Sequence, residues 1–305
     1  MHSAELQIPT EPPLGATVTS PDRPMASALI LQGSGVHNRD GAMPAFGFPS
    51  TLYSRLSRAL GEQGSIACLR YDKRGHDLPH DAPQEYSLTS RLADAQAALM
   101  VLIQRPELAG LPVFLIGHSE GAMLAAKLAV NVKLDLLVNG VVSLAAPFGN
   151  VFELNKFRAR KLANGPHVHL QERGRRALEF LSRLEGLFNE DDELSPAEFQ
   201  AFALAYRDAG YQGWESFQWL REHWLGLAQC DPPAEGIPML VIQGGRDARL
   251  WDDNSQRWRD WCAQRESADF CEIADMGHDL NDARRKAFVV HEEVVSEVLH
   301  WISNR

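Results

Sequence analysis

The chain has 305 residues, of which 45% are hydrophobic and 23% charged, as is typical of a globular protein with a sizeable core. Its formal net charge of −10 disfavours nucleic acid and anionic membranes as partners, because an acidic surface attracts neither. The first residues lack a basic segment followed by an apolar core, and no apolar run approaches ~18 residues. We therefore expect neither a secretory signal nor a membrane span.

Four scattered cysteines have no C-x-x-C spacing: Cys68, Cys230, Cys262 and Cys271. Each is expected to be a small buried hydrophobic residue rather than a disulfide partner or zinc ligand. Together with the missing signal sequence, they predict a reducing, cytoplasmic environment.

The first half of the chain predicts alternating strands and helices. About 25 residues rich in proline and threonine come first, with a short edge strand near 16–19. Leu52, Leu56 and Leu60 recur at helical spacing, and continuous apolar runs indicate buried strands. The expected elements are strands at 28–32, 65–71, 113–116 and 138–144, and helices at 49–61 and 88–103.

The pattern changes after residue 147. No convincing strand occurs between 148 and about 233, where aromatic-bearing helices are expected, among them 177–187 and 196–209. Strand character then resumes. The remaining elements are strands at 237–243 and 269–274 and helices at 255–264 and 284–301.

This order predicts an α/β fold with a mostly parallel central sheet and helices on both faces. Residues 1–147 and 234–305 would form the core. Residues 148–233 would be an inserted helical cap over the carboxyl ends of the strands, where sites of α/β proteins lie. A purely structural insertion is the alternative.

A nucleophile motif follows the strand at 113–116. Residues 117–121 read Gly-His-Ser-Glu-Gly, which is G-x-S-x-G with Ser119 at its centre, and an apolar, helix-favouring stretch comes next. A serine at such a strand-to-helix turn holds its hydroxyl clear of the sheet, and the small flanking residues allow the backbone to approach. Ser119 is therefore the predicted nucleophile.

Serine needs a base that an acid orients. His278 is the predicted base, because it lies in a glycine-containing loop after the strand at 269–274. Asp247 is the predicted acid, because it follows the strand at 237–243 and completes the order serine, aspartate, histidine. The competing residues are expected to be solvated, packed or directed away from Ser119: His118, His167, His169, His291, His300, Asp252, Asp253 and Asp275.

An oxyanion hole needs two N–H donors where charge develops. We expect one from the backbone of Glu120 and the other from Ser34, in the glycine-containing loop after the first buried strand. That loop lacks the spacing of a nucleotide-binding motif. His37 of the same loop, and the cap aromatics Trp214 and Phe217, are candidates for contact with substrate.

These motifs resemble those of the α/β-hydrolase superfamily over nearly the whole chain, and more narrowly those of bacterial esterases and dienelactone-hydrolase-like members. The resemblance rests on residues 33–41, Gly-Ser-Gly-Val-His-Asn-Arg-Asp-Gly, and 71–75, Tyr-Asp-Lys-Arg-Gly. It implies a Ser119–His278–Asp247 triad, an oxyanion loop at Ser34, a helical cap and no cofactor or metal. Val36 stands where such loops usually have proline. Arg39, Asp40 and residues 71–75 are expected to brace the loop through ion pairs.

The predicted function is hydrolysis of a carboxylic ester through an acyl-enzyme. Thioesters, lactones, amides or a C–C bond beside a ketone would suit the same site. Acyl transfer to another alcohol or thiol, and a catalytically silent ligand-binding homologue, are the alternatives. The aromatic-bearing cap favours a small-molecule substrate with an apolar group.

Overall fold

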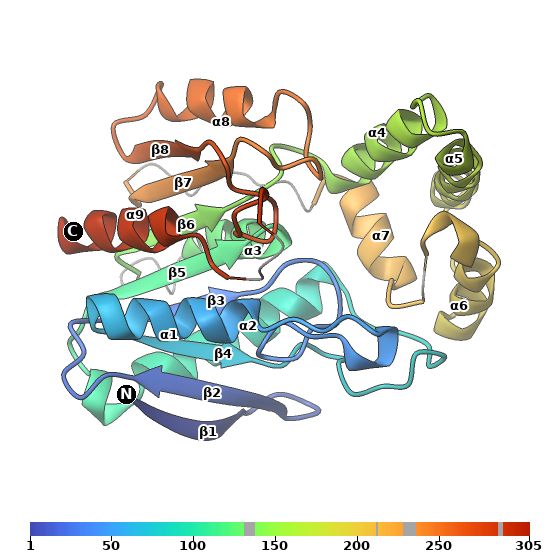
Figure 1. The fold of residues 1–305 in the computed structure, drawn as a ribbon. Helices are drawn as coiled ribbons and strands as arrows, with labels where there is room; N and C mark the ends of the chain where they lie inside the picture. Colours follow the sequence, from blue (N-terminus) through green and yellow to red (C-terminus); the bar gives the residue numbers. More distant parts are fainter. Residues whose placement is uncertain (131–137, 212, 228–235, 286–288) are drawn as a thin grey trace.

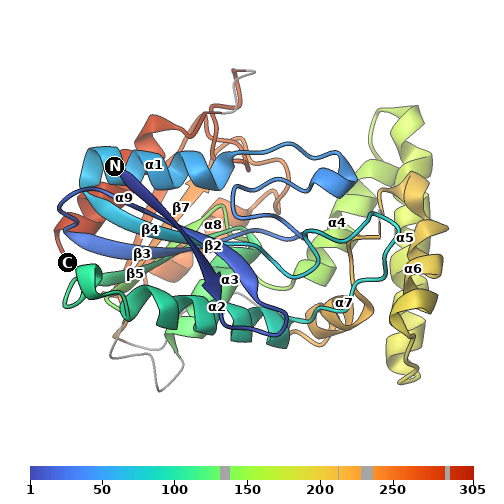
Figure 2. The same cartoon turned by 90° about the horizontal axis from the view of Figure 1, so that it is seen from below.

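The structure is a computed structural model that describes residues 1–130, 138–211, 213–227, 236–285 and 289–305. Its described residues form an eight-stranded sheet with a helical layer on each face (Figures 1 and 2). The strand order across the sheet is β1 (His2–Ile8), β2 (Leu14–Ser20), β4 (Ile66–Tyr71), β3 (Ala26–Leu31), β5 (Val113–His118), β6 (Gly140–Leu144), β7 (Met239–Gly244) and β8 (Ala268–Ile273).

Strands β3 to β8 are parallel, whereas β2 pairs antiparallel with both β1 and β4. Every residue of β3, β4, β5, β6 and β7 is buried, which explains their continuous apolar character in the sequence. The predicted mostly parallel sheet with helices on both faces is therefore confirmed.

Different helices cover the two faces of the sheet (Figure 2). Helices α1 (Leu52–Gly64) and α9 (Glu292–Ser303) pack on one face through one apolar cluster, and α2 (Leu88–Ile103), α3 (Glu120–Ala129) and α8 (Asn254–Cys262) contribute to the cluster on the other. The helices on both faces hold the sheet in place, and the loops that carry the candidate site residues follow its strands.

A separate group of helices lies beyond the carboxyl ends of the strands, and we call it the α4–α7 layer (Figure 1). Its members are α4 (Val151–Ala163), α5 (Val168–Asn189), α6 (Pro196–Leu204) and α7 (Phe217–Trp224). The layer packs around an aromatic cluster, in which Phe180 stacks on Tyr211 with ring centroids 3.7 Å apart and to which Val36 and Tyr86 also contribute. The division of the chain at residues 147 and 234 remains a prediction.

Several predicted elements differ from the structure. The helix predicted at 177–187 extends over Val168–Asn189, and the one predicted at 196–209 ends at Leu204. The first 20 residues form two strands, β1 and β2, rather than one short edge strand. The closing helix begins at Glu292 and not at 284, because the His291 side chain accepts a hydrogen bond from the Glu293 N–H and caps the helix there. No helix among the described residues is both long and apolar enough to cross a membrane. Cys230 lies outside the described residues.

Candidate active site

Ser119 lies at the turn between β5 and α3. Its backbone has φ of 55° and ψ of −121°, a strained conformation for a residue with a side chain. A Cβ atom on Gly121 would lie 2.1 Å from the Leu31 carbonyl oxygen, and one on Gly117 would lie 2.3 Å from the Gly121 carbonyl oxygen. Both glycines of the motif are therefore needed for close backbone approach, and Ser119 is left half-buried at the end of the sheet.

The structure brings the three predicted triad residues together. His278 Nε2 lies 3.1 Å from Ser119 Oγ, and His278 Nδ1 lies 2.7 Å from Asp247 Oδ2. The other Asp247 oxygen accepts a hydrogen bond of 2.9 Å from the Arg249 N–H. The loops after β7 and β8 supply the acid and the base, because neighbouring parallel strands end at the same edge of the sheet.

The competing carboxylates have other partners. Asp252 forms an ion pair with Lys161, Asp253 one with Arg257, and Asp275 two with Arg246 and Arg284. The remaining histidines also lie elsewhere: His291 caps α9, His300 is exposed near the end of the same helix, and the rings of His167 and His169 lie beside each other at the start of α5.

The loop after β3 approaches the nucleophile closely. A Cβ atom on Gly33 would lie 3.3 Å from Ser119 Cβ. Ser34 and Glu120 both line the cavity in front of Ser119, and no acceptor in the described part of the chain takes up either of their backbone N–H groups. These are the two donors that the sequence predicts for an oxyanion hole.

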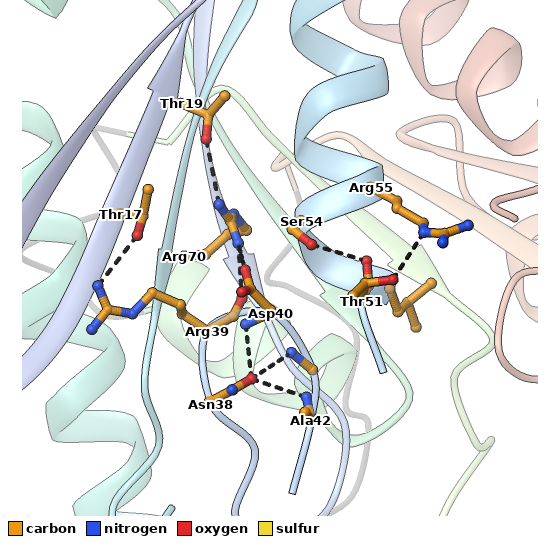
Figure 3. Close-up of polar contacts among 12 residues, drawn as sticks. Thr17, Thr19, Asn38, Arg39, Asp40, Ala42, Thr51, Ser54, Arg55 and Arg70 are labelled. Atoms are coloured by element: carbon orange, nitrogen blue, oxygen red, sulfur yellow. Dashed lines mark hydrogen bonds and ion pairs between the residues drawn. The ribbon is translucent and has the colours of Figure 1, made fainter. Parts of the chain in front are cut away.

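Ion pairs and a polar turn brace this loop (Figure 3). Arg39 Nη2 lies 2.6 Å from Asp72 Oδ2, and Arg70 pairs with Asp40 while also reaching Thr19. Asn38 Oδ1 accepts hydrogen bonds from three successive N–H groups, those of residues 40 to 42. The loop is thus held by ion pairs of Arg39 and Asp40, and the Arg39 pair involves Asp72 of the motif at residues 71–75, as expected.

His118 and Tyr53 connect this loop to the base, a link that the sequence reasoning missed. The Tyr53 hydroxyl accepts from the Gly33 N–H at 2.8 Å and lies 3.0 Å from His118 Nδ1. His118 Nε2 lies 2.8 Å from the His278 carbonyl oxygen. Burial and the adjacent His278 hold the pKa of His118 well below its usual value, so its neutral ring accepts from Tyr53 and donates to His278.

Glu120 anchors a second network that the sequence did not reveal. Its carboxylate is completely buried, 2.7 Å from Arg91 Nη1 and 3.4 Å from Lys73 Nζ. It also accepts from the Trp219 indole N–H and lies 3.2 Å from His223 Nε2, both on α7. Burial alone would raise the pKa of Glu120, but the Arg91 and Lys73 charges keep it well below its usual value.

The same two cations hold the loop after β3. Lys73 donates to the Gly33 carbonyl, and Arg91 Nη2 donates to the Gly35 carbonyl at 2.9 Å. Burial and the neighbouring Arg91 lower the pKa of Lys73 to about 7. One buried anion therefore connects the nucleophile turn, the loop of Ser34 and helix α7.

A cavity of about 430 Å³ lies between Ser119 and the α4–α7 layer. Its wall includes His37 and Trp214, two of the candidates for contact with substrate, and that contact remains a prediction. Phe217 is not part of that wall; it packs against Phe188 and Phe199 inside the layer, which disfavours a direct contact with substrate.

His37 is held between two carbonyl oxygens, those of Ser34 at 2.7 Å and Gly41 at 2.8 Å. Burial and the Lys73 charge lower its pKa to about 4, so the neutral ring donates to only one of them. Its contacts assign it a structural role in the loop. Within the described ranges, no group of three or more His, Cys, Asp or Glu side chains could hold a metal ion.

Comparisons with known proteins agree with this architecture. The model of the family described as "Alpha/beta hydrolase family" matches residues 33–291. Esterase EstD of Thermotoga maritima is 24% identical over 298 residues, and the match covers 94% of this chain but only 64% of that protein.

Solved structures show the same fold at low identity. A dienelactone hydrolase from Anabaena variabilis has a TM-score of 0.53 at 14% identity, over 99% of this chain and 97% of that one. An esterase from Pyrococcus furiosus has a TM-score of 0.57 at 15% identity, over 99% and 91%. The predicted resemblance to this superfamily is confirmed.

Proposed function

Because the chain belongs to the alpha/beta hydrolase family, we propose that it is a serine hydrolase that cleaves carboxylic esters. The observation that carries the proposal is the unbroken chain of contacts from Ser119 through His278 to Asp247. The match to an esterase supports it, although this chain spans only 64% of that protein's length. Asp247 orients the imidazole and stabilises its charged form.

In the proposed acylation, Ser119 Oγ attacks the ester carbonyl carbon while its proton passes to His278 Nε2. The carbonyl oxygen becomes an oxyanion that accepts from the N–H groups of Ser34 and Glu120. When the C–O bond breaks, the imidazolium returns the proton to the leaving alcohol. Water then attacks the acyl-enzyme by the same route, with His278 as base, and releases the acid and free Ser119.

We propose further that the α4–α7 layer acts as the cap of this site. The layer supplies apolar side chains to the cavity wall, among them Val151, Leu154 and Leu162 of α4. Such a wall suits a small-molecule substrate with an apolar group next to the scissile bond.

A fluorophosphonate tests the activated serine directly. The intact protein should gain the mass of one adduct, and Ser119→Ala should gain none. His278→Ala should react at least about a hundredfold more slowly, because the serine loses its base. Hydrolysis of aryl esters should fall in parallel. No adduct on well-folded parent protein would overturn the proposal.

A matched control separates the proposed acid from its neighbours. Asp247→Asn should slow ester hydrolysis by about 10³-fold or more, since the imidazole loses both its orientation and its charge stabilisation. Asp253→Asn, on a neighbouring loop residue paired with Arg257, should leave the rate unchanged. Equal rates in the two variants would remove Asp247 from the mechanism.

A further inference from the structure

A cation in the wall of the cavity lacks an ion-pair partner among the described residues. Arg158 of α4 lines the cavity in front of Ser119. Its Nε–H donates to the Arg249 carbonyl, and its Nη1 donates to Asn155 Oδ1 at 3.2 Å. Both acceptors are neutral, and no carboxylate of the described residues forms an ion pair with Arg158.

The remaining N–H groups of Arg158 are free to donate hydrogen bonds to a ligand. A guanidinium carries five N–H groups, and the two bonds above occupy one on Nε and one on Nη1. One on Nη1 and two on Nη2 have no acceptor in the described part of the protein. This is the edge that binds a carboxylate through two parallel hydrogen bonds.

Three other arginines of the α4–α7 layer have carboxylate partners. Arg175 pairs with Glu172, Arg176 with Glu179 and Asp208, and Arg221 with Asp191 and Glu193. Among the described residues, Arg160, Arg173 and Arg183 form no ion pair. Of these three, Arg173 alone lines the cavity, and its Nε donates to the Ala209 carbonyl at 3.4 Å. The layer therefore turns two arginines without a carboxylate partner toward the cavity.

The acidic groups of the cavity wall are engaged elsewhere. Asp279 lies 3.2 Å from Arg249, and Glu120 is held by Arg91 and Lys73. Glu215 is buried and accepts from the Gly213 N–H. Burial lowers the pKa of Arg158 to about 10, and the negative charge of Asp247 limits this decrease. Because this pKa is still well above 7, the side chain remains a cation at neutral pH.

We propose that Arg158, together with Arg173 of the same cavity wall, forms an anion subsite that binds a carboxylate on the substrate, away from the scissile ester bond. The apolar wall of Leu154 and Leu162 would contact the carbon chain between the two ends. This inference rests on the proposed esterase function and narrows its substrate class to acidic esters, such as monoesters of dicarboxylic acids. Positive charge facing a half-buried cavity favours an anion more than the same charge on an open surface would.

The test uses two pairs of aryl esters in which a carboxylate is replaced by an acetyl group of similar size. In one pair the acyl group is hexanedioate or 6-oxoheptanoate, and in the other hexanoate is esterified to 4-hydroxybenzoate or 4-hydroxyacetophenone. The measured quantity is the ratio of kcat/KM for the acidic ester to that for its neutral partner. We expect this ratio to exceed about ten in the parent for at least one pair.

Variants of the same helix assign that preference to Arg158. Arg158→Gln should lower the ratio about ten- to hundredfold, and Arg158→Lys should retain part of it. Arg160→Gln, on an exposed residue two positions further along α4, should leave it unchanged. Because each variant is compared on both esters of a pair, a general loss of activity from a disturbed Arg249 loop cancels.

The outcomes separate this inference from the function on which it rests. A parent that reacts with the fluorophosphonate and cleaves neutral esters, but prefers neither acidic ester, overturns the anion subsite alone. An acidic preference that survives in Arg158→Gln places the subsite elsewhere and equally overturns it. Absence of an adduct at Ser119 overturns the esterase function itself.

Discussion

The Glu120 carboxylate lies 2.7 Å from the Arg91 guanidinium, fully buried and directly after Ser119 in the chain. Through Arg91 and Lys73 the same carboxylate reaches the carbonyl groups of Gly33 and Gly35, and through Trp219 it reaches helix α7. A buried anion that loses a partner costs several kcal/mol. The nucleophile turn, the loop of Ser34 and α7 should therefore be energetically coupled.

Glu120→Gln tests this coupling. The neutral amide leaves two buried cations close together, and the free energy of unfolding should fall by about 3 kcal/mol. The loss should be larger at pH 6 than at pH 8, because Lys73, with a pKa of about 7, is already losing its proton at the higher pH. Urea unfolding at the two pH values measures both effects.

The matched control is Glu107→Gln. Glu107 is exposed and pairs with Arg105, so solvent screens the pair and the loss should stay below about 1 kcal/mol. If the two glutamine variants unfold at the same urea concentration, the buried cluster contributes nothing particular to stability.

Trp219→Phe tests the attachment of α7. Phenylalanine keeps most of the packing but removes the indole N–H that Glu120 accepts, and a hydrogen bond to a charged group contributes about 1.5–3 kcal/mol. Hydrogen exchange should increase in α7 more than in the strands. Trp224→Phe, at the end of α7 against Phe188, provides the comparison. Equal exchange in the two variants would argue against a specific anchor at Glu120.

Much of this architecture could be predicted from local sequence signals. Buried parallel strands give continuous apolar runs, and the order of Ser119, Asp247 and His278 follows from loops that end at one edge of the sheet. The first strand was missed because its pattern is half polar. Ala4, Leu6 and Ile8 alternate with more exposed residues, and this period of two is the signal that could have found it.

The networks around Ser119 were not predictable in the same way. Glu120 and Trp219 are 99 positions apart, and His118 and His278 are 160 positions apart. No periodicity links such residues, because tertiary packing alone determines which buried polar groups meet. Likewise, the sequence does not distinguish the aromatic residues Phe217 and Trp214, yet of the two only Trp214 lines the cavity.

Tyr53→Phe tests the link between the loop of Ser34 and His278. The variant leaves the buried Gly33 N–H and His118 Nδ1 without their shared partner. We expect kcat for an aryl ester to fall about tenfold with little change in KM, and stability to fall by about 1–2 kcal/mol. Tyr206→Phe also removes a buried hydroxyl, one that donates to Glu179 far from Ser119. It should lower stability alone, and an equal loss of kcat there would contradict a specific role for Tyr53.

Two buried histidines should make the protein acid-sensitive. Burial lowers the pKa of His118 well below 6.5 and that of His37 to about 4, whereas both titrate near 6.5 in the unfolded chain. As pH falls below 6.5, the unfolded state binds protons that the folded state does not. The free energy of unfolding should therefore be highest above pH 6.5 and fall by up to about 1.4 kcal/mol per pH unit for each histidine.

Urea unfolding between pH 7.5 and 5 measures this slope, in a range where ordinary carboxylates remain ionised. His37→Asn should reduce the slope, and replacement of the exposed His300 should not. A flat profile would show that the folded protein accepts the charged imidazoles.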